Sequence, residues 1–116
     1  MQNIEAARKA AHESAQWNLQ GLYADPKQER LETAYRETAD CWMFFQRRDI
    51  AIPPERSLSQ GAYAVSKHSM EERFVPDFRD NELRLAAYLE LLSDHFLKAA
   101  QTNELMQKDA GANPST

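Results

Sequence analysis

The run "CWMFF", Cys41 to Phe45, constrains the fold more than any other feature of this 116-residue chain. In a helix, five consecutive apolar residues cover more than a full turn, because each turn takes only 3.6 residues. A single neighbouring surface cannot bury such a segment. Two interpretations stay open: a helix enclosed by several other elements and by the "IAIPP" loop, or an aromatic patch exposed for a partner or a dimer.

Apolar residues at helical spacing predict four helices. The first extends from about Ile4 to Leu22 with Asn3 as its N-cap, and its apolar stripe continues through Ala7, Ala11, Ala15 and Leu19. The second begins at the capping pattern of Asp25, Pro26 and Gln28 and continues to about Arg48. The third begins at Pro54 or Glu55 and fades by Ser69, and Gly61 with its neighbouring alanines forms a small-residue notch that admits a neighbour.

The fourth predicted helix, from Asn81 to about Leu105 with Asp80 as its cap, carries two apolar stripes. One stripe faces the core, and the opposite stripe needs a second neighbour. That neighbour is the 74–80 connection, another helix or a second chain. The core stripe is Leu85, Tyr88, Leu89, Leu92 and Phe96, and the opposite one is Leu83, Ala87 and Leu91.

These elements predict an all-α fold, a compact antiparallel bundle of about four helices. Residues 1–108 form a single helical domain, and residues 109–116 form a disordered C-terminal tail without periodicity.

The charge balance argues against nucleic acid and against an anionic membrane as the partner, because the net charge is −4. The single cysteine, Cys41, excludes an intramolecular disulfide and favours a reducing compartment. The N-terminal segment lacks the order of a signal peptide, and no apolar run approaches the roughly 20 residues that span a bilayer. We therefore expect a cytoplasmic protein.

The residues that could carry chemistry do not form a recognisable constellation. His68 has Glu71 and Glu72 at helical spacing, but a carboxylate-bridged metal site needs Glu-x-x-His on two helices. Cys41 lies in an apolar segment, where cysteine is usually a small core residue. We expect no catalytic residue, no metal and no cofactor, and hence no enzyme.

The stretch "LSQGAYAVSK", followed by an acidic connection and "DNELRLAAY", resembles a family of small all-helical bacterial immunity proteins. These proteins neutralise type VI-secreted toxins that degrade NAD or NADP. The resemblance covers about Glu13 to Leu92 and is carried by Gly61, Ala64, Val65 and Lys67, then by Glu82, Leu83 and Tyr88, with "YADPKQERLETAYRE" upstream.

The resemblance implies a cytoplasmic immunity protein that binds its cognate toxin protein and inhibits it by occluding the active site. The candidate toxin interface is the polar run and the connection after it: Lys67, His68, Glu71, Glu72, Arg73, Phe74, Asp77 and Phe78. An alternative is a homodimeric helical interaction or regulatory module without catalytic activity. A third is a ligand- or metal-binding bundle.

Overall fold

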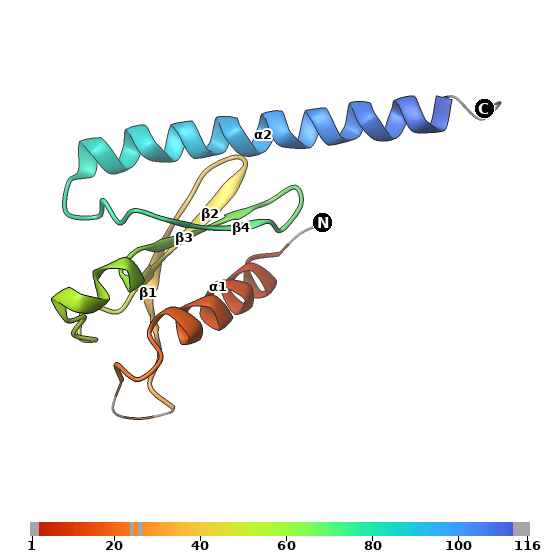
Figure 1. Cartoon of the computed structure of the whole chain (residues 1–116). Helices are drawn as coiled ribbons and strands as arrows, with labels where there is room; N and C mark the ends of the chain where they lie inside the picture. The colour runs from red at the N-terminus through yellow and green to blue at the C-terminus, as the bar shows by residue number, and fades with distance from the viewer. Residues whose placement is uncertain (1–2, 24, 26, 113–116) are drawn as a thin grey trace.

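The chain folds into a four-stranded antiparallel sheet with a helix on each face (Figure 1). The structure is a computed structural model that describes residues 3–23, 25 and 27–112, with side chains up to Leu105. The sheet is a simple meander of order β1-β2-β3-β4. Its strands are β1 (Leu31–Glu37), β2 (Cys41–Gln46), β3 (Ala62–Ser66) and β4 (Glu72–Val75).

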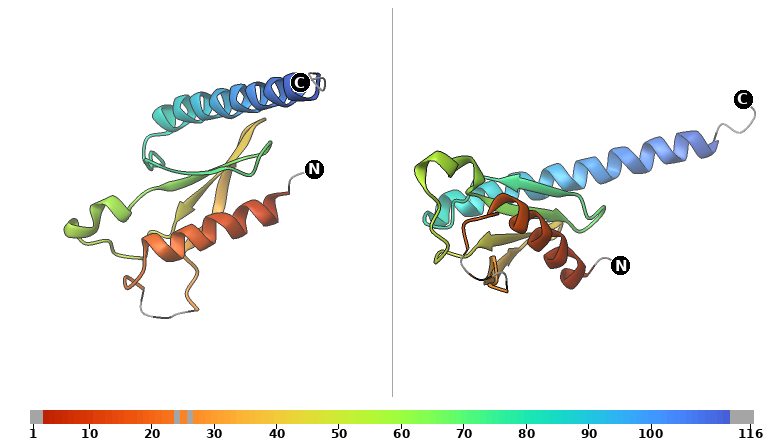
Figure 2. Two further views of the ribbon diagram at one scale, coloured as in Figure 1. Left: turned by 45° about the vertical axis from the view of Figure 1, so that its right-hand side comes forward. Right: turned by 60° about the horizontal axis from the view of Figure 1, so that its bottom comes forward.

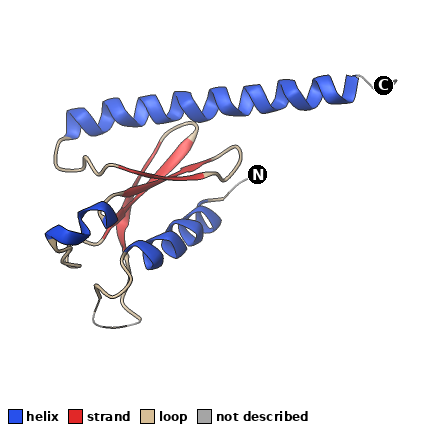
Figure 3. Ribbon diagram, viewed as in Figure 1, coloured by secondary structure: helices blue, strands red, loops and turns tan. Residues whose placement is uncertain are grey.

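Two α-helices and one 3-10 helix complete the described chain. They are α1 (Ile4–Asn18), the 3-10 helix η1 (Pro54–Ser59) and α2 (Glu82–Ala112). The two α-helices lie on opposite sides of the sheet in all views (Figures 2 and 3). The all-α fold and the four-helix bundle predicted from sequence are therefore wrong, and the fold is α+β.

The run "CWMFF" is the central strand β2, and it is apolar throughout because both of its faces are covered. Trp42 and Phe44 point toward α1, whereas Cys41, Met43 and Phe45 point toward α2. Successive side chains of a strand alternate between faces, so a strand between two helices needs no polar residues. Both helical interpretations of the run, enclosed or exposed, are corrected by this arrangement.

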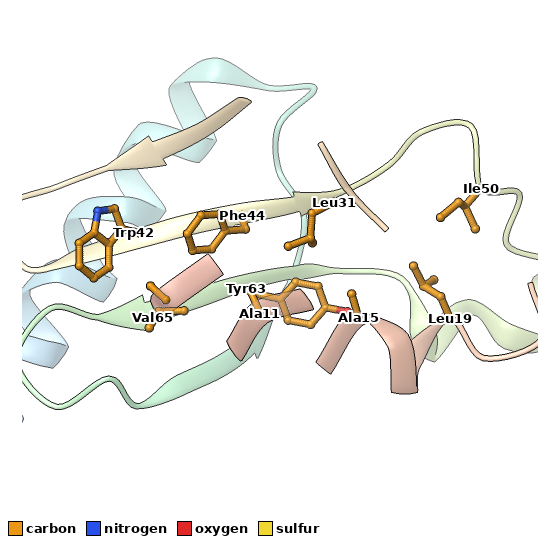
Figure 4. Packing of buried hydrophobic residues seen from close by; sticks show 10 residues of the cluster. Ala11, Ala15, Leu19, Leu31, Trp42, Phe44, Ile50, Tyr63 and Val65 are labelled. Carbon is orange, nitrogen blue, oxygen red and sulfur yellow. The ribbon is translucent and has the colours of Figure 1, made fainter. Parts of the chain in front are cut away.

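The core on the α1 side joins α1 to β2 and β3 (Figure 4). Ala7, Ala11 and Ala15 are fully buried. Their small side chains let the helix approach the sheet closely enough to contact Phe44 and Tyr63. The buried stripe predicted for the first helix is confirmed through Leu19, but the helix ends at Asn18 and not at about Leu22. The Asn3 side chain caps the helix by accepting the N–H of Ala6 at 2.8 Å.

The core on the α2 side is formed by the predicted stripe of the last helix. Leu85, Leu89, Leu92 and Phe96 are buried against the other face of the sheet. The cap lies one residue later than predicted, because the Asn81 side chain accepts the N–H of Arg84, while Asp80 pairs with Arg48. The helix reaches Ala112, so residues 109–112 of the predicted tail are helical, and 113–116 lie outside the described residues.

The second predicted helix is replaced by a turn and two strands. Asp25 accepts the N–H of Lys27 at 2.9 Å, which closes a local turn rather than a helix cap. Pro26 lies outside the described residues. The third predicted helix begins correctly at Pro54 but ends at Ser59, and β3 follows.

Candidate functional site

The predicted interface residues belong to three separate places. Lys67, His68 and Glu71 lie in the turn between β3 and β4, Glu72, Arg73 and Phe74 lie on β4, and Asp77 and Phe78 precede α2. Within β4, Arg73 pairs with Ala64 of the α2-facing core, whereas Glu72 and Phe74 pair with the α1-facing Val65 and Tyr63. The residues therefore do not form one continuous surface.

Most of these side chains are held by internal contacts. The Lys67 Nζ contacts Glu37 Oε2 at 2.5 Å, the Asp77 carboxylate contacts the Arg79 Nε at 2.9 Å, and the Arg73 Nη1 lies 2.7 Å from His95 Nε2. The aromatic candidates also have ring partners, since Phe74 packs at a tilt against Tyr63 and Phe78 packs edge-on against Tyr88. For these residues, the internal contacts limit what a partner could reach, whereas Glu71 is exposed.

A polar cluster of Thr38, Asp40, His68 and Ser93 connects the two hairpin turns to α2. Ser93 donates its hydroxyl to Asp40 Oδ2 at 2.6 Å, and Thr38 donates to the Ser93 oxygen at 3.0 Å. On the other side of the carboxylate, His68 Nε2 lies 2.8 Å from Asp40 Oδ1. The hydroxyl of Ser93, chiefly, and then His68 hold the pKa of Asp40 below its usual value, against the effect of desolvation.

The order of groups in this cluster decides what it can do. A nucleophile needs a base that takes its proton, and here the carboxylate lies between Ser93 and His68, so the imidazole does not contact the hydroxyl. Cys41 beside it is fully buried, and burial raises the pKa of its thiol. The cluster ties three elements together, and its geometry fits a structural role.

Metal ligation finds no support in the part of the chain that the structure describes. No three His, Cys, Asp or Glu side chains gather there in a way that could hold an ion. The helical spacing suggested for His68 and Glu72 does not exist, because one lies in a turn and the other in a strand.

A pocket of about 520 Å³ lies where the loop after β2 meets the loop before α2. Three arginines line it, and each already has a carboxylate partner: Arg47 pairs with Asp49, Arg48 with Asp80, and Arg79 with Asp77. The paired charges leave the pocket without a strong field for a phosphate or another anion.

Four of the eight large apolar side chains that are exposed among the described residues lie on the outer side of α2. Leu83 is 86% exposed, Leu91 68%, Leu105 62% and Leu97 37%. They lie opposite the buried stripe, and α2 extends past the end of the sheet toward its C-terminus (Figures 1 and 2). The sequence analysis placed Leu83, Ala87 and Leu91 in this stripe, but it did not extend the stripe to Leu97 and Leu105, although the predicted helix reached about Leu105.

A second exposed apolar site lies on α1, on the opposite face of the sheet from α2. Trp17 on α1 is 77% exposed and lines an open depression with Tyr23 and Arg30. The Arg30 guanidinium stacks on the Tyr23 ring at 3.8 Å. Trp17 is the one large apolar side chain of this depression that is exposed among the described residues, so the depression carries no apolar stripe.

Comparison with known proteins finds no matching family model, no matching curated protein and no matching solved structure. No described helix is both long enough and apolar enough to cross a membrane.

Proposed function

We propose that this chain is a protein-binding module without chemistry of its own, and that the outer side of α2 is its docking face. The observation that carries the proposal is the row of exposed leucines on α2, Leu83, Leu91, Leu97 and Leu105. Exposed apolar residues gathered along one element are typical of protein interfaces, whereas scattered ones are not.

The shape of α2 supports the same function. Among the α2 residues whose side chains the structure describes, Phe96 is the last that is buried in the core, yet the helix continues to Ala112. Helices are marginal in water without tertiary packing, so the segment from Leu97 to Leu105, in which no described side chain is buried, is stabilised when a partner covers it.

Inhibition of a toxin, which would also be a protein-binding function, stays a prediction. The all-helical fold implied by the immunity-protein resemblance is wrong. Of its motif residues, Ala64 and Val65 lie in β3 and Gly61 directly precedes this strand, so none of the three lies in a helix. The proposal therefore rests on α2 and not on the resemblance.

The size of the chain's assembly in extracts of cells that produce it tests the proposal. Native protein should elute from gel filtration well above the 13.3 kDa of one chain. A double variant, Leu83→Glu with Leu91→Glu, should elute as a single chain, because two buried carboxylates oppose docking.

Leu58→Glu is the matched control, since Leu58 is 92% exposed on η1, away from α2. This variant should elute like the native protein, and all three purified proteins should be folded at room temperature, which shows that the double variant loses docking and not its fold. Elution of the native chain at 13.3 kDa, or an equal effect of L58E, would contradict the proposal.

A further inference from the structure

The charged residues beside the exposed leucines of α2 have an order that can select a partner. Between Leu83 and Leu105 the outer side of the helix carries Arg84 and then Glu90 near its beginning, and Lys98 and then Glu104 near its end. At 100° per residue, the four leucines lie within about a third of the helix circumference, opposite Leu85, Leu89, Leu92 and Phe96.

We propose that the occupant of this face is a second copy of the chain, docked antiparallel, α2 against α2, with the two-fold axis at Asp94. This inference rests on the proposed function. In this register, residues equally far before and after Asp94 face each other across the axis. Leu83 meets Leu105 and Leu91 meets Leu97, so every exposed leucine of α2 among the described residues gains an apolar partner.

The charges agree with the same register. Arg84 of one copy faces Glu104 of the other, and Glu90 faces Lys98, and a two-fold axis makes each of these contacts twice. A parallel pair would instead place each residue against itself, so that Glu90 meets Glu90 and Lys98 meets Lys98. Complementary charges fix orientation and register more than they add affinity.

Neighbouring antiparallel registers pair the exposed leucines and the charged residues less favourably. An axis about one turn earlier, at Leu91, places Arg84 against Lys98. An axis about one turn later, at Lys98, brings the two lysines together and leaves Leu83 without a counterpart. The Asp94 register places only the two Asp94 carboxylates against each other. That repulsion is reduced because the Lys98 Nζ of the same helix contacts each carboxylate at 2.9 Å.

Cysteine cross-linking of the purified full chain tests the arrangement. A disulfide needs Cα atoms within about 7 Å. Asp94→Cys should therefore cross-link to itself under mild oxidation, since position 94 lies on the axis. Leu83→Cys should not, because its two copies lie about 33 Å apart. A mixture of L83C with Leu105→Cys should cross-link.

Two controls accompany this experiment. The native chain should not cross-link, because its Cys41 is fully buried. Lys9→Cys, at an exposed position on α1, reports random collisions and should give no disulfide cross-link. Sedimentation of the native chain should give about twice 13.3 kDa.

Each contrary outcome has a defined meaning. Cross-linking of L83C with itself would overturn the antiparallel register in favour of a parallel one. If the purified chain sediments as a monomer at every concentration over a 100-fold range, the proposed dimer is wrong. If that monomer still eluted as a larger assembly in native extract, and the α2 double variant abolished it, docking at α2 would stand with a different protein as its occupant.

Discussion

Gly61 lies where two parts of the chain leave no room for a side chain. A Cβ built on it would come within 2.7 Å of the Phe74 ring and within 2.7 Å of the Val75 carbonyl oxygen. The sequence correctly indicated a close approach at this residue, but the neighbour is strand β4 and not a second helix. The Phe74 ring can rotate away, whereas the backbone oxygen of a paired strand cannot move freely.

Gly61→Ala should therefore destabilise the fold by about 1–3 kcal/mol, the usual cost of overpacking. Urea unfolding measures the change. Adding Phe74→Leu should recover only part of the loss, because the contact with the Val75 oxygen remains. Full stability of G61A alone would show that β4 does not lie against this residue.

Asp40 makes stability depend on pH in an acidic range. Its pKa in the folded protein is below the usual 3.8, mainly because Ser93 donates to it and then because His68 contacts it. A carboxylate with a lowered folded pKa contributes stability above its unfolded pKa, and that contribution disappears as pH falls through the folded value. The contribution is therefore complete at neutral pH and lost below 3.8.

Asp40→Asn should lower the free energy of unfolding by about 1 kcal/mol at pH 7, the scale of one net hydrogen bond. The difference from the native protein should shrink when both are measured at progressively lower pH, below 3.8. A difference that stays constant across that range would show that Asp40 is not held as an anion by Ser93 and His68.

Strands β2 and β3 are buried on both faces, and this explains why their pattern misled the sequence-based prediction. A short apolar run without alternation is equally compatible with a buried helix and a central strand. Leu31, Trp42 and Phe45 fit helical spacing in the sequence, but they belong to two strands with a turn between them. Aromatic and β-branched residues are frequent in strands, and their concentration in 42–45 and 63–65 was the signal that favoured a sheet.

The two faces of β2 should respond independently to mutation. Phe44 belongs to the core under α1 and Phe45 to the core under α2. Phe44→Leu and Phe45→Leu should each cost about 1 kcal/mol, and the double variant should show the sum within about 0.5 kcal/mol.

Phe44 and Tyr63 provide the contrasting pair, because they face each other across strands in one core. Phe44→Leu with Tyr63→Leu should depart from additivity by more than 0.5 kcal/mol. Strong coupling between Phe44 and Phe45 in a urea double-mutant cycle would contradict the separation of the two cores.

Both terminal helices were predictable because each exposes one side to solvent. Ala7, Ala11 and Ala15 on α1, and Leu85 and Leu89 on α2, repeat at the period of a helix with one buried face. The polar cluster of Thr38, Asp40, His68 and Ser93 was not predictable, because its members come from two turns and a helix far apart in sequence. Only the sheet pairing brings them together.

At the scale of the whole molecule, the three layers leave a single long helix face without a partner in the described chain. α1 and the inner side of α2 close the two faces of the sheet, and the outer side of α2 faces solvent (Figure 1). The sequence analysis predicted that the opposite stripe of the last helix needs a second neighbour, and this stays a prediction. It could not identify that neighbour, because the 74–80 connection and other helices were also candidates until the sheet was known.

The central claim is that this outer side of α2 binds protein, and site-specific photo-cross-linking in producing cells tests it most directly. A photoreactive amino acid replaces Leu91 in one variant and Leu58, exposed on η1, in the other. The account predicts one discrete covalent adduct from position 91 and none from position 58. Absence of an adduct at position 91, or equal adducts at both positions, would contradict it.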